Sequence, residues 1–207
     1  MTDQQIEQLV RADRDLITEI IPHGSSVLDL GCGDGALLAR LIEKKGAVGC
    51  GIDIDEHNLI LCVERGLSVS QDDLDEGLED FLDDSYDYVI LNQTLQVIKK
   101  PDKIIREMLR VGRYGVIGFP NFGHWFLRLS LIFHGRMPKS STLPFTWYNT
   151  PNIHQLTIRD FKDYCSSEHI SIIREEYFIA GKWRNSLVWQ PFVNMLALNG
   201  MFVLKGQ

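Results

Sequence analysis

The chain has 207 residues, of which 44% are hydrophobic and 24% are charged, and its formal net charge at pH 7 is -7. This composition is typical of a globular protein with a sizeable core. An acidic balance without any long Lys/Arg cluster argues against a nucleic-acid partner, because binding to phosphates depends on basic surfaces. The polar N-terminus lacks the layout of a signal peptide, and the apolar runs are too short to span a bilayer. We therefore expect a cytoplasmic protein that binds no membrane.

Helical and strand patterns alternate along the first 120 residues. Apolar residues at helical spacing predict a helix over residues 3–21, which Pro22 ends. After it, short apolar runs predict strands at 26–30, 48–53, 67–70, 86–92 and 114–119. The segments between them predict helices at 37–45, 56–65, 75–82 and 101–111. Strands that alternate with helices indicate βαβ units and a parallel sheet.

The alternation stops after Pro120. Residues 121–155 are rich in Pro, Asn, Gly and aromatic residues, and their apolar stretch 125–133 is expected to be helical. Thr157 and Asp160 have the spacing of a capping box, which predicts a helix to about residue 164. The last two strands are predicted at 170–179 and 198–204. We predict one domain over residues 1–207, with an inserted segment at about 121–155 that caps a pocket or docks a partner.

The chain has four cysteines, at positions 32, 50, 62 and 165, and none of them forms a Cys-x-x-Cys pair. In a reducing compartment they are expected to be free thiols that pack as small hydrophobic residues. Their spacing argues against a zinc site, so we predict no metal.

A glycine-rich segment, Asp29-Leu30-Gly31-Cys32-Gly33-Asp34-Gly35, joins the strand at 26–30 to the helix that follows it. Glycines let a ligand approach the backbone, and a helix N-terminus offers free N–H groups, so this arrangement is typical of a nucleotide site. The glycines alone allow two nucleotides. Gly31-x-Gly33-x-x-Ala36 fits the NAD fingerprint, and Asp53 stands where that fingerprint expects a ribose-binding acid.

Three neighbouring features favour S-adenosylmethionine. Asp29 is unfavourable beside a pyrophosphate but favourable beside a cationic sulfonium and ammonium. Gly35 keeps the turn open, and Gln71-Asp72-Asp73-Leu74 ends the third strand, where a carboxylate can accept the exocyclic amine of adenine. Each acid also has a structural interpretation: a hydrogen-bonded strand end for Asp29, a helix N-cap for Asp53, and a solvated face for the acidic run after residue 71.

As a set, these residues resemble class I S-adenosylmethionine-dependent methyltransferases, whose first motif matches Val27–Gly35. Asp53 with Ile54 matches their ribose acid and its neighbour, and residues 86–96 match the fourth strand and the turn that faces the methyl donor. The resemblance implies a doubly wound, Rossmann-like α/β sheet, mostly parallel with an antiparallel last strand and with helices on both faces. It implies a site for S-adenosylmethionine or S-adenosylhomocysteine formed by Asp29, Leu30, Gly31, Cys32, Gly33, Gly35, Asp53, Ile54, Asp72, Asp73, Leu74, Asn92 and Gln93.

The second half carries a more specific resemblance. Residues 119–125, 135–138 and 143–154 look like the methionine biosynthesis protein W (MetW) family, and with the methyltransferase core the match runs from about residue 20 to about residue 180. The resemblance implies a role in methionine biosynthesis together with a homoserine O-acyltransferase.

Catalytic residues are the least defined part of the sequence. His124, Tyr148 and His154 are candidates for a general base, although the two histidines also suit turn capping. Asn92-Gln93-Thr94-Leu95 lacks the Asn/Asp-Pro-Pro-aromatic signature of nucleic-acid amino methylation. Two hypotheses follow: a protein that binds an adenosyl ligand and acts with or regulates the acyltransferase, or a stand-alone small-molecule methyltransferase. An NAD-binding oxidoreductase is the remote alternative.

Overall fold

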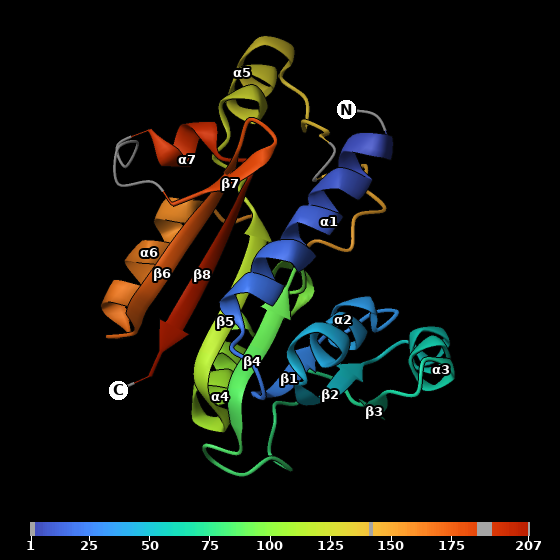
Figure 1. Cartoon of the computed structure of the whole chain (residues 1–207). Coiled ribbons are helices and arrows are strands. Elements are labelled where there is room, and N and C mark those ends of the chain that lie inside the picture. The colour runs from blue at the N-terminus through green and yellow to red at the C-terminus, as the bar shows by residue number, and fades with distance from the viewer. Residues whose placement is uncertain (1–2, 141–142, 186–191, 207) are drawn as a thin grey trace.

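A computed structural model describes residues 3–140, 143–185 and 192–206 of the chain (Figure 1). The strands are β1 (Ser26–Leu30), β2 (Val48–Asp53), β3 (Ser68–Gln71), β4 (Tyr86–Asn92), β5 (Gly112–Pro120), β6 (Ser171–Ile179), β7 (Lys182–Arg184) and β8 (Asn199–Lys205). The helices are α1 (Asp3–Ile20), α2 (Ala36–Lys45), α3 (Glu56–Glu64), the 3₁₀ turn η1 (Leu95–Val97), α4 (Pro101–Val111), α5 (Trp125–His134), α6 (Ile158–Ser167) and α7 (Val193–Leu196).

The strands form one sheet in the order β3-β2-β1-β4-β5-β8-β6-β7. Neighbours among β1 to β5 pair in parallel, whereas β8 is antiparallel to both β5 and β6. The predicted fold class is therefore confirmed, including the antiparallel last strand. The strand order reverses between β1 and β4, and in such sheets the ligand crevice lies at that point, outside the carboxyl ends of the strands.

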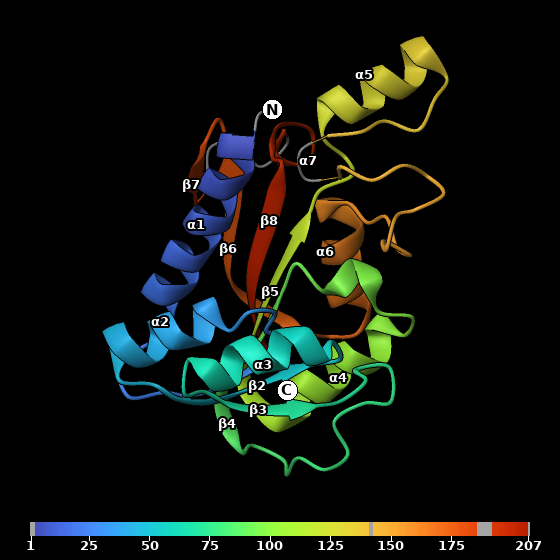
Figure 2. The ribbon, with the colours of Figure 1, turned by 90° about the vertical axis from the view of Figure 1, so that its right-hand side faces the viewer.

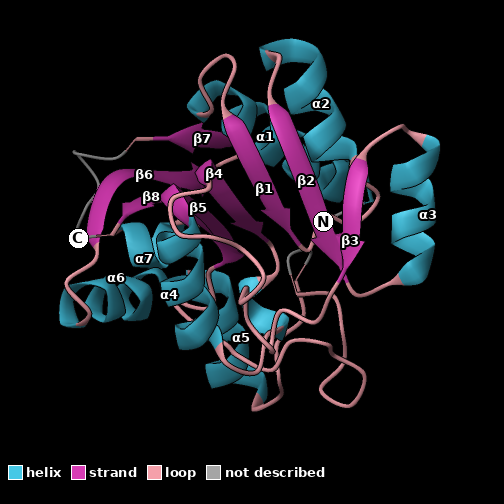
Figure 3. Cartoon of the chain, turned by 90° about the horizontal axis from the view of Figure 1, so that it is seen from below, coloured by secondary structure: helices cyan, strands magenta, loops and turns pink. Residues whose placement is uncertain are grey.

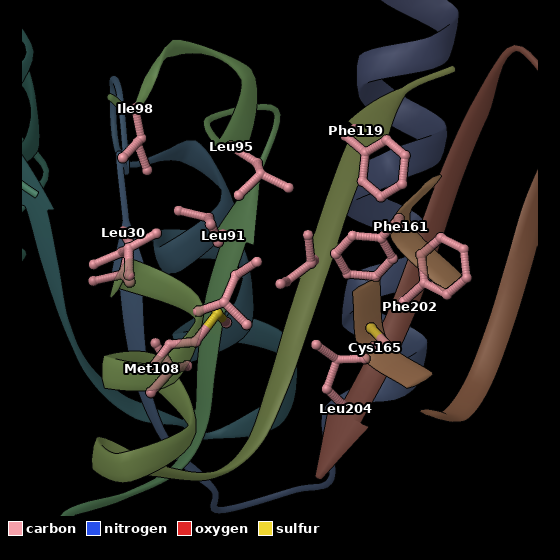
Figure 4. Close-up of a cluster of buried hydrophobic side chains, with 14 of the residues drawn as sticks. Leu30, Leu91, Leu95, Ile98, Met108, Phe119, Phe161, Cys165, Phe202 and Leu204 are labelled. Carbon is pink, nitrogen blue, oxygen red and sulfur yellow. The ribbon is translucent and has the colours of Figure 1, made fainter. Parts of the chain in front are cut away.

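Helices cover both faces of the sheet, with α1 and α2 on one side and α4 and α6 on the other (Figure 3). Successive residues of a strand point to opposite faces. Leu28 and Leu30 of β1 accordingly belong to the core beneath α4 and α6, part of which Figure 4 shows. Val27 belongs to the core beneath α1 and α2, and Asp29 faces the same side as Val27.

Local sequence sets most of the helix boundaries. Gly46 adopts a left-handed conformation after Lys45 and donates to the last carbonyls of α2, which ends the helix. Pro101 occupies the first turn of α4, where its missing N–H costs nothing. Thr157 and Asp160 form the predicted capping box at the start of α6.

The predicted helix over residues 75–82 is wrong. This stretch is a series of turns, and Gly77 has a left-handed φ of 102°. The Arg110 side chain of α4 donates to the carbonyls of Leu78 and Phe81 at 2.8 Å each, so tertiary contacts provide bonds that a helix would otherwise supply. Sequence patterns also missed η1, β7 and α7, which have only three or four residues each.

The segment after β5 leaves the sheet at the carboxyl ends of the strands. Its first part forms α5, the helix expected from the apolar stretch 125–133, which projects away from the rest of the chain (Figure 2). Across the described residues, no helix is both long enough and apolar enough to cross a membrane.

Candidate functional site

Three glycines shape the loop after β1. Gly31, Gly33 and Gly35 have positive φ angles of 72°, 55° and 72°, which side-chain-bearing residues rarely adopt. A Cβ on Gly31 would lie 2.6 Å from Thr94 Oγ1, and one on Gly35 would lie 2.7 Å from Cys62 Sγ. A Cβ on Gly33 would meet nothing within 4 Å. Two of the glycines therefore permit close packing, and Gly33 leaves open space beside the backbone.

A cavity of about 320 Å³ opens beside this loop, at the carboxyl ends of β1, β2, β3 and β4. It is lined by Gly31, Asp53, Ile54, Asp72, Asp73, Leu74, Asp75, Gln93, Thr94, Val97, Ile98 and Lys99. Seven of the predicted site residues are in this lining, and they come from four separate turns. The other six, Asp29, Leu30, Cys32, Gly33, Gly35 and Asn92, lie in or next to the loop and strands that frame the cavity.

Asp53 connects the end of β2 to the glycine loop. Its carboxylate accepts from the Gly33 N–H at 2.8 Å and from the Asp55 N–H at 2.9 Å. Asp55, not Asp53, is the N-cap of α3, because its side chain accepts from the His57 N–H. The structural interpretation of Asp53 as a helix cap therefore fails. Asn58 Nδ2 also donates to Asp53 Oδ1 at 3.4 Å, so three hydrogen bonds orient a carboxylate that lines the cavity and keeps one acceptor position for a ligand.

Asp29 is almost completely buried, with 3% of its surface exposed. Burial, followed by the nearby Asp53 carboxylate, raises the pKa of Asp29 to about 7, and Arg14 lowers it. The described residues donate no hydrogen bond to this carboxylate, so the interpretation of Asp29 as a hydrogen-bonded strand end is not supported. A buried carboxylate with neither hydrogen bonds nor a close cation is costly unless a ligand provides them.

Asp13 of α1 is a second buried carboxylate, which the sequence analysis missed. It is 2% exposed, and burial raises its pKa to about 7. Gln93 Nε2 donates to Asp13 Oδ2 at 3.1 Å, while Oδ1 has no hydrogen-bond partner among the residues that the structure describes. The available signal was its position on the apolar stripe of α1, between the buried Leu9 and Ile17.

Asp34 at the tip of the loop is occupied by structural contacts. Its carboxylate pairs with Arg14 of α1 at 3.5 Å and with Arg65 at the end of α3 at 2.9 Å. It also accepts from the Ala36 N–H at the start of α2. Asp34 thus ties three helices to the loop, and Arg14, the cation that acts on both Asp13 and Asp29, is shared with it.

Leu30 and Cys32 act as packing residues. Leu30 is fully buried, and the Sγ atoms of Cys32 and Cys62 lie 4.0 Å apart behind the loop. Burial raises the pKa of both thiols, which disfavours the reactive thiolate. All four cysteines are free thiols, as predicted.

The turn after β3 is built by its own acidic residues. Asp72 and Asp73 each accept a hydrogen bond from a backbone N–H one or two residues ahead. Asp75, which the sequence analysis did not single out, accepts from the N–H groups of Lys99 and Lys100 at 2.7 and 3.2 Å. These bonds hold the turn against the segment before α4 and fix Leu74 in the cavity wall.

Gln93 links the cavity to the segment after β5. It has a positive φ of 59°, and its carbonyl accepts from Gln96 Nε2 at 2.8 Å. The carbonyl of Gln96 in turn accepts from the N–H groups of Ile153 and His154 at 2.8 and 3.0 Å. A short hydrogen-bonded path therefore runs from Asp13 and the cavity wall to the far end of the inserted segment.

None of the three candidate bases lines this cavity. His124 caps α5 by accepting from the Phe126 N–H at 3.3 Å, and burial lowers its pKa. Tyr148 is exposed beside Trp147. His154 lines a separate, mostly apolar cavity with Leu95, Phe161 and Tyr164 among others. The alternative prediction for His124, that it caps a turn, is therefore confirmed: its side chain caps the start of α5.

A family model described as "Methionine biosynthesis protein MetW" matches residues 11–204. The chain belongs to the MetW family. The resemblance drawn from the sequence is thus confirmed, and the chain is a methionine biosynthesis protein of that family with a methyltransferase-like fold.

Among curated relatives, the bifunctional methionine biosynthesis protein MetXA/MetW of Rhodopirellula baltica is 43% identical over 82% of this chain. The chain spans only 28% of that relative's length. A ubiquinone biosynthesis O-methyltransferase of Pseudomonas fluorescens is 31% identical over 44% of this chain and 41% of its own length.

Solved structures show the same fold. An S-adenosylmethionine-dependent methyltransferase of Thermotoga maritima, described as a possible histamine N-methyltransferase, superimposes with a TM-score of 0.71 at 11% identity. The match covers 99% of this chain and 92% of that chain. At 11% identity this similarity shows that the chain has the class I methyltransferase fold, but it does not indicate which substrate the chain acts on.

Proposed function

We propose that this MetW-family chain binds S-adenosylmethionine or S-adenosylhomocysteine in the cavity beside Gly31 and acts with a homoserine O-acyltransferase, whose activity it regulates. The observation that supports an adenosyl ligand is a pair of buried carboxylates at the edge of the cavity: Asp29 lies in β1 just before the glycine loop, and Asp13 accepts from the cavity-wall residue Gln93. Neither carboxylate has a cation of its own, because Arg14 also pairs with Asp34.

This charge pattern supports a cationic ligand. Adenosylmethionine carries a sulfonium and an ammonium, and its demethylated product retains the ammonium. A cation beside a buried carboxylate offsets the desolvation that otherwise disfavours the charged acid. The pyrophosphate of NAD would instead add negative charge to a cavity already lined by Asp53, Asp72, Asp73 and Asp75, so the remote oxidoreductase alternative fits less well.

The other turns around the cavity fit the remainder of the ligand. Asp53 is placed to accept ribose hydroxyls, because it ends β2 and faces the cavity. Asp72 and Asp73 offer acceptors for the exocyclic amine of adenine, and Leu74 and Ile54 offer apolar surface for the ring. Gln93 and Thr94, at the end of β4, lie where the methyl-bearing part of the ligand is expected.

The acyltransferase partner is supported by the Rhodopirellula relative, in which MetXA and MetW are parts of one polypeptide. We take its MetXA part to be the homoserine O-acyltransferase. Fusion keeps two proteins at a high effective concentration, which benefits proteins that act together. In this organization the chain would report adenosyl-ligand levels to the enzyme that commits homoserine to methionine synthesis.

Calorimetry and an acyltransferase assay test the proposal. The chain is titrated with adenosylmethionine, adenosylhomocysteine and NAD, and acyl transfer is measured with and without the chain and each adenosyl ligand. We expect binding of an adenosyl ligand but not of NAD, and a change in acyl transfer when the chain is added. If the chain binds NAD but neither adenosyl ligand, the proposed ligand is wrong. If the acyl-transfer rate stays the same with the chain alone and with the chain plus each adenosyl ligand, the regulatory role is wrong.

Asp13 favours a second candidate function, a stand-alone small-molecule methyltransferase. Its Oδ2 accepts from the cavity-wall residue Gln93, its Oδ1 has no hydrogen-bond partner among the described residues, and a pKa of about 7 suits a general base that takes a proton from an acceptor. In that case Asp13→Asn would abolish formation of adenosylhomocysteine while adenosylmethionine still binds. If no adenosylhomocysteine forms with wild-type chain across amine, hydroxyl and thiol acceptors, this candidate is rejected.

A further inference from the structure

The inserted segment carries an unusual surface. Roughly half of the exposed large hydrophobic side chains found in the described residues fall between residues 125 and 153. Six of them lie on α5, and these six side chains are 41–75% exposed. At 100° per residue, the five residues Trp125, Phe126, Leu129, Ile132 and Phe133 share one side of the helix, and we call them the α5 stripe; Leu131, which is 50% exposed, lies on another side. Leu127 is the buried residue of α5 and lies on another side.

The described chain leaves the stripe partly uncovered, with its five side chains 41–75% exposed. Figures 1 and 2 show α5 projecting from the carboxyl end of β5, away from the body of the molecule. A helix with one apolar side normally packs that side against other apolar residues, because exposed apolar surface is unfavourable in water. Contiguous apolar patches on a protein surface commonly mark interaction sites.

The charge of the segment differs from that of the rest of the chain. Residues 121–155 contain Arg128, Arg136 and Lys139 but no Asp or Glu, although the whole chain has 28 acidic residues and a net charge of -7. An apolar stripe on a segment with cationic but no acidic side chains fits an apolar groove flanked by acidic residues on a partner. Two copies of this stripe would bring like charges together, which makes self-association less favourable.

We infer that the α5 stripe is the surface that docks the homoserine O-acyltransferase, with α5 inserted in an apolar, acid-rimmed groove of that enzyme. This inference rests on the proposed function, which supplies the partner. Burying an aromatic side chain removes about 150–250 Å² from water. Because its three aromatic side chains are 43–75% exposed, the stripe supplies part of the roughly 800 Å² that one partner contributes to a standard interface.

The position of the stripe also suits regulation by ligand. The segment begins directly after β5 and returns to the ligand cavity at Ile153 and His154, whose N–H groups donate to the Gln96 carbonyl. Gln96 Nε2 donates to the carbonyl of Gln93 in the cavity wall. Docking at α5 therefore takes place on a segment whose far end is hydrogen-bonded, through Gln96, to the cavity-wall residue Gln93.

The test measures binding between the chain and the homoserine O-acyltransferase of the same organism by biolayer interferometry. The variant carries Ile132→Ser and Phe133→Ser, which remove side chains that are 72% and 75% exposed. The matched control carries Val48→Ser and Leu82→Ser, side chains that are 73% and 78% exposed at the opposite end of the sheet. We expect the stripe variant to bind at least about tenfold more weakly, because central apolar anchors dominate interfaces. The control should bind as the wild type does, and both variants should bind adenosylmethionine normally.

The outcomes separate the surface from the partner. If wild type and stripe variant bind the acyltransferase equally, or if the control loses as much affinity, the docking surface is wrong while the partner stands. If the wild type does not bind the acyltransferase with or without adenosylmethionine, the partner in the proposed function fails and the inference fails with it. Light scattering that shows a wild-type dimer and a monomeric stripe variant, or flotation with phosphatidylglycerol vesicles that requires the stripe, would assign the surface to a second copy or to a membrane instead.

Discussion

Replacing Asp29 by Asn removes the negative charge beneath the glycine loop and keeps the shape of the side chain. Burial raises the pKa of Asp29 to about 7, so the folded protein holds a proton there that the unfolded chain releases near its ordinary pKa of 3.8. The free energy of unfolding of the wild type, compared with that of a protein with an uncharged side chain at position 29, therefore falls as the pH rises above 3.8. The ionisable Asp29 lowers the free energy of unfolding by about 4 kcal/mol at pH 8 and by about 1.5 kcal/mol at pH 5.

The buried amide of Asn at position 29 has a pH-independent cost of its own, about 1–3 kcal/mol if its groups stay unpaired. Asp29→Asn should therefore stabilise the ligand-free protein at pH 8, and this gain should shrink by about 2.5 kcal/mol on going to pH 5. Urea denaturation followed by circular dichroism measures the difference, with Asp80→Asn as the exposed control. At pH 8 the same variant should bind adenosylmethionine at least about tenfold more weakly, because the cation loses its buried partner.

Two results would refute this reasoning. A stability difference between wild type and Asp29→Asn that does not change with pH would mean that the carboxylate is not disfavoured by burial. Unchanged affinity for adenosylmethionine would mean that the buried charge of Asp29 does not serve a cationic ligand.

Three further changes test the cavity and the fold. Gly33→Ala and its control Gly24→Ala both place a Cβ on a left-handed residue with no neighbour within 4 Å, so each should lower the free energy of unfolding by about 1 kcal/mol. Only Gly33→Ala should also lose adenosylmethionine binding, measured by calorimetry. If the two variants bind adenosylmethionine with equal affinity, Gly33 is not part of the site. Asp53→Ala should leave the circular dichroism spectrum intact but weaken adenosyl-ligand binding at least about tenfold, because hydrogen bonds to a charged group are lost; an unchanged Kd would contradict the ribose role. Thr157→Ala breaks the capping box of α6 and should lower the free energy of unfolding by about 1 kcal/mol, or the Tm by about 2–4 °C; an unchanged Tm would show that the cap contributes nothing measurable.

Seven of the residues predicted to form the site line one cavity, and the sequence could bring them together because the parts of the site are local. A strand end, a glycine turn and an acid one or two residues away are contiguous in the chain, and the parallel sheet brings the ends of successive strands to one edge. The sequence pattern alone therefore predicted that four residues from separate turns share one site, and the structure has all four in the lining of one cavity: Gly31, Asp53, Leu74 and Gln93.

Contacts between distant segments could not be predicted in this way. Asp13 and Gln93 are 80 residues apart, and their hydrogen bond depends on how α1 crosses the end of β4. The acidic run after Leu74 has a helical composition, yet Arg110 from α4 holds it as turns. In both cases a long-range partner changed the meaning of a local pattern.

By itself, the sequence determined the alternating α/β fold, the glycine loop with its flanking acids, and membership of the MetW family, because each depends on short-range pattern and residue type. Only the tertiary structure decided that Asp13 and Asp29 are buried without cations of their own, and that α5 leaves its apolar stripe exposed. The physical reason is that burial and charge compensation are properties of packing. A carboxylate or a phenylalanine has the same identity in the core and on the surface, and its free energy depends on the atoms that the rest of the chain places around it.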